Sequence, residues 1–130
     1  MRTFVVAALL AALGLSLGCG QKKQPLTASG KPVSHWVEAL KSKDPKERAK
    51  AVEKLGNAGN ADGTVLPALL DALRDPDAHV RHAAVLALPK LGADSREALP
   101  VLTEMKQKDK DALVRDVAGK VIPRIEGAGP

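Results

Sequence analysis

From residue 33 onward, apolar residues recur at steps of three and four positions, the spacing that places side chains on one face of an α-helix. Breaks in this pattern occur at residues 43–45, 75–76 and 108–110, and glycine-containing turns are expected at residues 56–63 and at Gly92. These interruptions predict three pairs of helices and no strands. The apolar positions on the predicted helices are Val33, Trp36, Val37, Leu40, Ala51, Val52, Leu55, Leu66, Leu69, Leu70, Leu73, Val80, Ala84, Val85, Leu88, Leu99, Leu102, Met105, Val114, Ala118, Val121, Ile122 and Ile125.

The helix pairs also repeat one another in sequence. Residues 80–91 recur as residues 114–125 at a constant offset, with Arg81 matching Arg115, and a fainter copy around Arg48 lies about one period upstream. A fixed period in this range is typical of a solenoid, in which each unit buries its apolar face against its neighbours. The sequence therefore predicts an all-α fold, an α-α superhelix of about three helical hairpins.

Each unit carries Asp-Pro or an isolated Asp, then an Arg, paired small residues and a closing Leu or Ile, and this order resembles a HEAT repeat. The short form found in bacterial HEAT-like proteins, including the group related to bilin lyases, is the most similar. The resemblance covers roughly residues 33–127 and implies a right-handed superhelix, but it is specific for fold and implies no activity. Ankyrin and tetratricopeptide repeats share the period, yet the chain lacks the ankyrin Thr-Pro-Leu-His start and contains no Tyr. The residues that carry the resemblance most fully are Asp75, Pro76, Val80, Arg81, Ala84, Val85, Leu88, Leu91 and Gly92.

The resemblance further implies a structural ladder of acidic and basic residues. In HEAT-like proteins the carboxylate caps the second helix of a unit, and the guanidinium bridges neighbouring units. Arginine suits this role better than lysine, because its planar fork satisfies several acceptors at once. The alternative is a basic stripe of three arginines that binds an acidic ligand. The ladder residues are Asp44, Arg48, Asp75, Arg81, Asp109 and Arg115.

The N-terminal segment has the features of an export signal. A positive start at Arg2 precedes the apolar run Phe4–Leu17, which is shorter than the roughly 20 residues of a membrane-spanning helix. Residues 15–19 end in Cys19, the only cysteine, and resemble the lipobox of bacterial lipoproteins, although Ser16 stands where Leu is commonest. An uncleaved anchor and an ordinary signal are the alternatives. We expect a lipoprotein signal peptide at 1–18, a lipidated Cys19 with a flexible tether at 19–31, and the HEAT-repeat domain at 32–127.

The charge balance narrows the choice of partners. The formal net charge is +5 and the pI is about 9.5, which favours acidic partners or anionic surfaces. Nucleic acid is not an expected partner, because the chain is predicted to be exported and has few aromatic platforms for stacking bases. Gly20 follows the cysteine where inner-membrane lipoproteins tend to have Asp, so this resemblance favours the outer membrane, facing the periplasm.

The sequence offers no constellation for catalysis or cofactor binding. His79 and His82 are three positions apart, a spacing that can hold a metal, but further ligands would have to come from Asp75 or Asp77, which are better placed as helix caps. No Ser/His/Asp set, glycine-rich phosphate loop or H-E-x-x-H motif is present. We therefore expect no enzymatic activity, no metal and no cofactor.

By analogy with HEAT-like solenoids, the second helices line a concave side that a partner can reach. The exposed row there is mostly basic and suits an acidic protein segment or an anionic envelope polymer, unless it is merely solvated. The expected function is that of a membrane-anchored adaptor for protein–protein interaction at the cell envelope. The alternatives are a structural envelope protein that self-associates through its C-terminal end, and a non-catalytic subunit of an envelope enzyme complex. The partner-binding candidates are His82, Leu86, Lys90, Asp116, Lys120 and Arg124.

Overall fold

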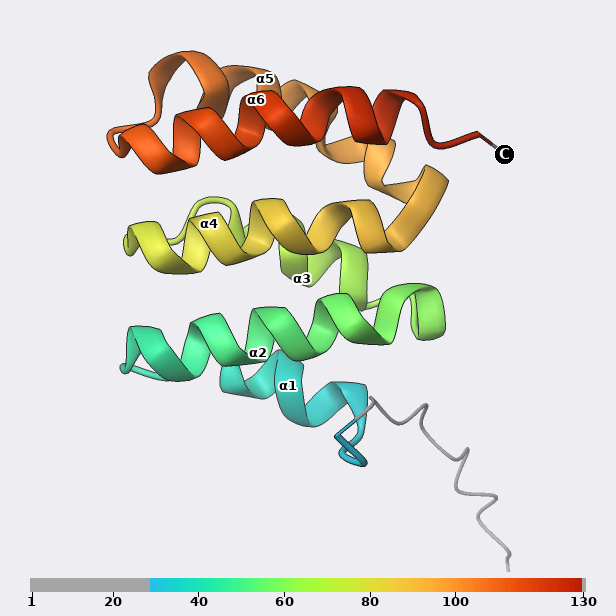
Figure 1. The fold of residues 1–130 in the computed structure, drawn as a ribbon. Helices are drawn as coiled ribbons and strands as arrows, with labels where there is room; N and C mark the ends of the chain where they lie inside the picture. The colour runs from blue at the N-terminus through green and yellow to red at the C-terminus, as the bar shows by residue number, and fades with distance from the viewer. Residues whose placement is uncertain (1–28, 130) are drawn as a thin grey trace, which may run out of the picture.

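The computed structural model describes residues 29–129, and within that range it contains six α-helices and no strand. The predicted signal peptide, Cys19 and most of the tether lie outside the described residues. The helices form three consecutive hairpins, α1 with α2, α3 with α4, and α5 with α6 (Figure 1), which confirms the all-α prediction. The elements are α1 (Val33–Ala39), α2 (Pro45–Ala58), η1 (Gly59–Ala61), α3 (Val65–Ala72), α4 (Ala78–Ala87), η2 (Leu88–Ala98), α5 (Leu99–Lys108) and α6 (Ala112–Glu126).

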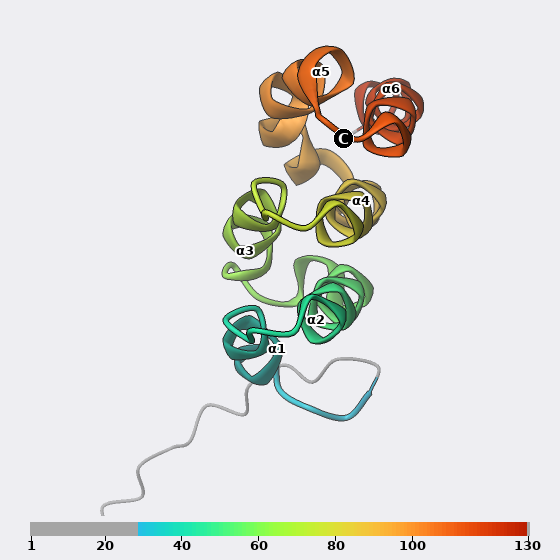
Figure 2. The same ribbon diagram turned by 90° about the vertical axis from the view of Figure 1, so that its left-hand side faces the viewer.

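The hairpins stack in chain order and make two columns of helices. The first helices of the hairpins form one column and the second helices form the other (Figure 2). In the second column α2 packs on α4, and α4 packs on α6, so neighbouring units are in direct contact. One continuous surface therefore runs along the second helices of all three hairpins.

A single apolar core extends through all three units. Leu55, Leu69, Leu88, Leu102 and Ile125 are fully buried, and they belong to the same cluster. Burying one such side chain contributes about 1.5–3 kcal/mol to stability relative to leaving it exposed. Because the cluster crosses the boundaries between units, each hairpin relies on its neighbour to cover its apolar side.

The ends of the second helices differ in part from the prediction. The turn expected from Gly56 begins later, because α2 continues to Ala58 and Gly56 is buried inside it. Gly59 and Gly92 occupy equivalent positions in successive units, and both adopt left-handed backbone angles, with φ of 57° and 61°. Glycine reaches this region without the steric cost that a Cβ imposes, so the two positions reverse the chain in the same way.

The first helix of the second unit has no side-chain cap at its N-terminus. Thr64 occupies the N-cap position of α3, but its side chain makes no capping hydrogen bond. Instead its hydroxyl donates to Oδ1 of Asp62 at 2.7 Å. Asp62 thereby organises the turn that precedes α3, and this hydrogen bond lowers the pKa of the Asp62 carboxyl.

Candidate interaction surface

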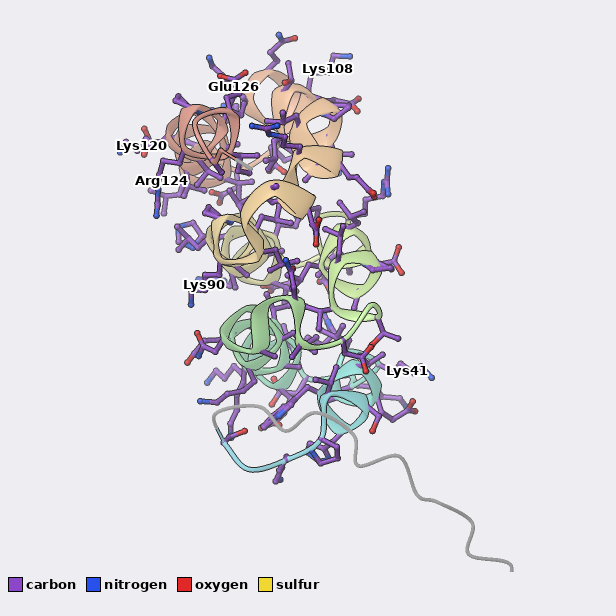
Figure 3. All side chains as sticks on the ribbon, turned by 90° about the vertical axis from the view of Figure 1, so that its right-hand side faces the viewer. Lys41, Lys90, Lys108, Lys120, Arg124 and Glu126 are labelled. Atoms are coloured by element: carbon purple, nitrogen blue, oxygen red, sulfur yellow. The ribbon has the colours of Figure 1, made fainter. Side chains whose placement is uncertain are left out.

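Exposed residues at equal repeat positions form rows across the second helices. One row joins Glu53 on α2 to Leu86 on α4 and Lys120 on α6. Lys90 and Arg124 occupy the next row. Lys90, Lys120 and Arg124 project from the column of second helices, whereas Lys41 projects from the opposite column (Figure 3). We call this exposed face of α2, α4 and α6 the second-helix surface.

A shallow groove of about 750 Å³ runs across the second-helix surface, mainly between α2 and α4. It brings together four of the six predicted partner-binding residues. The other two, Asp116 and Lys120, do not line it; they pair with each other at 2.7 Å on the exposed side of α6. The groove is lined by Lys46, Ala49, Lys50, Glu53, His82, Ala83, Leu86, Ala87, Lys90 and Arg124.

The α2 side of the groove was largely missed by sequence reasoning. None of the six predicted partner-binding residues lies on α2, and Lys46, Ala49 and Glu53 were not assigned to a binding surface. The signal for Ala49 and Glu53 was present, because they are the counterparts of His82 and Leu86 in the preceding unit. Small side chains such as Ala49 leave space between neighbouring helices, and that space is the groove.

Both large hydrophobic side chains that are strongly exposed in residues 29–129 lie on second helices. Leu86 is 43% exposed and Leu113 is 69% exposed. Leu113 borders a smaller hollow of about 140 Å³, together with Ala78, His79, His82 and Asp111. His82 lines both the hollow and the groove. Exposed apolar residues surrounded by polar ones are typical of protein interaction sites.

The charge of the groove is predominantly positive. Lys46, Lys50, Lys90 and Arg124 line it, and Glu53 is its only acidic lining residue. Lys90 is held in place, because its Nζ donates to Oδ1 of Asn57 at 2.7 Å. Several cations on one face raise the local potential and attract acidic partners.

Two predicted ladder arginines bridge neighbouring units. Nε and Nη2 of Arg48 donate to the two carboxylate oxygens of Asp75, at 2.8 and 3.0 Å. Arg81 makes the same pair of bonds to Asp109, both at 2.9 Å. Such bidentate pairs fix geometry more firmly than a single hydrogen bond. Because these guanidinium groups are engaged and largely buried, Arg48 and Arg81 do not form a free basic stripe.

Hydrogen bonding between partners also sets the protonation of the ladder. The hydrogen bond to Asp75 raises the pKa of Arg48, and the hydrogen bond to Asp109 raises that of Arg81. Burial alone would raise the pKa of the Asp109 carboxyl, but the hydrogen bond from Arg81 outweighs it, together with other bonds and charges, and the net pKa is lowered. The guanidinium of Arg81 and the carboxylate of Asp109 are therefore both charged at neutral pH.

Asp44 has the capping role that the resemblance implied, but the same role was wrong for the other two ladder carboxylates, Asp75 and Asp109. It caps α2 by accepting the N–H of Lys46 at 2.9 Å. Asp75 and Asp109 instead accept from the arginines, and they are not the N-caps that the resemblance implied. The caps of α4 and α6 lie two positions further on, at Asp77 and Asp111.

The spacing to the arginine explains this difference. Asp44 lies four positions before Arg48, but Asp75 lies six before Arg81, so the first unit has Ser42 at the ladder position. Nη1 of Arg48 donates to the carbonyl of Ser42, just as Nη1 of Arg81 donates to the carbonyl of Asp75. The first unit therefore has a hydroxyl where its neighbours have a carboxylate.

Comparison with known proteins agrees with this geometry. A family model for HEAT repeats matches residues 33–122, which is more than half of the chain. The chain belongs to the HEAT-repeat family. No curated protein matches this HEAT-repeat chain. HEAT repeats are commonly scaffolds for protein interactions, and the family is generally non-catalytic.

Other kinds of site find little support in the described part of this HEAT-repeat protein. Nδ1 of His79 lies 3.5 Å from Oδ1 of Asp77, but no group of three or more His, Cys, Asp or Glu in residues 29–129 is arranged to hold a metal ion. None of the helices described there has the length and apolar character to cross a bilayer. The second-helix surface is thus the best candidate for function in this range.

Proposed function

We propose that this HEAT-repeat protein is a membrane-anchored adaptor that binds an acidic protein segment on its second-helix surface. The observation that carries the proposal is the groove lined by four cations and by the exposed side chain of Leu86. An acidic segment with an apolar residue would complement both the cations and the side chain of Leu86. The cations would speed its association and fix its register, and the leucine would contribute apolar burial.

The shape of the surface supports a protein segment over a uniform polymer. The groove and the smaller hollow at Leu113 meet at His82, so the apolar contacts lie at two separate places along the second helices. A polypeptide can present side chains of different character at such intervals. An anionic polymer of uniform chemistry would use only the cations.

Binding of a labelled peptide rich in Glu and bearing two Leu residues tests this proposal by fluorescence anisotropy. We expect the double variant Lys90→Glu, Arg124→Glu to weaken binding by about tenfold or more, because two attractive charges become repulsive. Added salt should weaken binding by the unmodified chain, since screening reduces attraction between exposed charges.

The matched control is Lys41→Glu, Lys108→Glu, which makes the same change in net charge on the side of the first helices. This variant should bind the peptide almost as the unmodified chain does. Equal weakening by both double variants would show that only net charge matters. A peptide with the two leucines replaced by Ser should bind more weakly; if it binds equally, the apolar part of the proposal is wrong.

We further propose that Cys19 carries a lipid that holds the protein at the cell envelope, at the outer membrane facing the periplasm. The support is the resemblance of residues 15–19 to a lipobox and the Gly at position 20. Acyl chains contribute about 0.8 kcal/mol for each buried methylene, so more than one chain anchors a protein stably.

The anchor is tested by fractionating cells that express the full chain or its Cys19→Ser variant. We expect the unmodified protein in the membrane fraction and the variant in the soluble fraction, because serine cannot take the thioether-linked lipid. Separation of the two membranes then locates the protein. Retention of the Cys19→Ser variant in membranes would contradict a lipid anchor at this position.

A further inference from the structure

Arg115 is the last arginine of the ladder, and only part of its guanidinium is engaged. Its Nη1 donates to the carbonyl oxygens of Asp109 and Lys110, the same local contacts that Arg48 and Arg81 make within their own units. In those two arginines, Nε and Nη2 bind the carboxylate of the following unit. Within residues 29–129 no carboxylate bonds to Nε or Nη2 of Arg115. The Nη1 edge of its guanidinium is therefore hydrogen-bonded to backbone carbonyls, and the edge with Nε and Nη2 is available to a carboxylate.

The helix stripe that normally faces the next unit is also present in α6. In α2 this stripe is Arg48, Val52 and Leu55. In the second unit it is Arg81 and Val85 of α4 with Leu88, the residue that follows α4. All four apolar members are fully buried. The stripe continues to Gly56, where the position of a Cβ would lie only 2.7 Å from the Cβ of Ala87 in the next unit. This contact shows that the stripe packs against the following hairpin.

The corresponding stripe in α6 is Arg115, Gly119 and Ile122, and we call it the third-unit flank. Ile122 is only partly buried. At Gly119 the hydrocarbon chain of Lys106 lies beside the helix, and its nearest atoms are 3.6–3.7 Å from the position that a Cβ would take. Lys106 is exposed, and a lysine chain can move aside at small cost, so the flank can receive an apolar side chain.

The flank is accessible from solvent near Arg115. The C-terminal tail lies at the far end of α6 from its first turn (Figure 1), and Nη2 of Arg96 holds it by donating to the carbonyl of Ala128 at 2.6 Å. The tail therefore does not cover the open edge of the guanidinium.

We propose that the third-unit flank binds the start of a helix in a partner protein, with an Asp or Glu carboxylate of that partner on Arg115. The carboxylate takes the place that Asp75 takes on Arg48 and Asp109 takes on Arg81, and the partner's helix packs on Ile122 and Gly119. A second copy of this chain is a poor occupant, because its first unit has Ser42 where the carboxylate is needed. The contact is separate from the groove on the second-helix surface.

The test uses the full chain and a synthetic peptide that copies residues 93–126, which supplies the same helix start that docks on Arg81. Binding is followed by NMR at the Nε–H signal of Arg115. We expect this signal to shift on addition of the peptide. A peptide with Asp109→Asn should bind at least about tenfold more weakly, because it lacks the second charged oxygen.

Two variants of the full chain give the matched comparison. Arg115→Lys keeps the charge but loses the planar fork, so it should bind the peptide at least about tenfold more weakly. Arg124→Lys makes the same change on the second-helix surface and should bind the peptide as the unmodified chain does. The proposal is overturned if the Arg115 signal does not shift, if both peptides bind equally, or if Arg124→Lys weakens binding as much as Arg115→Lys.

Discussion

Replacing Arg81 by Met should lower the free energy of unfolding by about 3–5 kcal/mol, the cost typical of breaking a buried ion pair on one side. The side chain of Asp109 is only 7% exposed, and both of its oxygens accept hydrogen bonds from Arg81. Without the guanidinium a charged carboxylate would remain at the contact between the second and third units. Urea unfolding followed by far-UV circular dichroism measures the loss.

Two further variants distinguish the effect of breaking the Arg81–Asp109 ion pair from the effect of losing any arginine side chain. Arg115→Met makes the same substitution at the same repeat position, where the guanidinium is hydrogen-bonded to backbone carbonyls and to no carboxylate of the described residues, and should cost about 1 kcal/mol for its lost hydrogen bonds. Adding Asp109→Asn to Arg81→Met should recover part of the stability, since no unpaired charge is then buried. Equal losses for Arg81→Met and Arg115→Met would contradict the importance of the pair.

Gly56→Ala should destabilise the protein by about 1–3 kcal/mol, although alanine favours a helix more than glycine does. A Cβ at this position would lie 2.7 Å from the Cβ of Ala87 and 3.2 Å from its Cα. Neither atom is the end of a flexible chain, so the two helices have to move apart. The midpoint and slope of urea unfolding measure the effect.

The steric origin of this loss is tested by a compensating change. Ala87→Gly removes the opposing methyl group, and the double variant should be more stable than the sum of the two single effects predicts. Gly63→Ala is the matched control, because no atom lies within 4 Å of its added Cβ, and it should change stability by less than about 1 kcal/mol. If Gly56→Ala proves neutral, close approach of α2 and α4 at this point is not required.

The fold could be predicted almost completely from the sequence, for a physical reason. The helical spacing of apolar residues is a local pattern, and the offset between Arg81 and Arg115 is a repeated one. Both can be read from the sequence without knowledge of tertiary contacts. The third unit shows a feature that the sequence repeat did not predict. Pro89 and Pro123 share a repeat position, yet α4 ends at Ala87 whereas α6 continues through Pro123 to Glu126. The segment after each proline differs, because η2 leads to another hairpin, whereas α6 is the last helix of the described residues.

The candidate site was predictable only in part. Its α4 and α6 residues could be chosen from helix periodicity, which placed Lys90 and Arg124 on the face that the groove occupies. The groove depends on how closely α2 and α4 approach, and that distance is set by contacts such as Gly56 with Ala87. The error in the capping role of Asp75 and Asp109 had a simpler source, because they were matched to Asp44 by residue type while their distance from the arginine was overlooked.

The mutual stabilisation of the three hairpins can be tested directly at Trp36. Trp36 is the only tryptophan and lies in α1 of the first unit, whereas Arg81 acts at the contact between the second and third units. Urea unfolding of Arg81→Met should be followed by Trp36 fluorescence and by far-UV circular dichroism. If each hairpin depends on its neighbours, both transitions shift together to the same lower midpoint. An unchanged Trp36 transition beside a shifted dichroism transition would show that the first hairpin is stable independently, and mutual stabilisation would then be wrong.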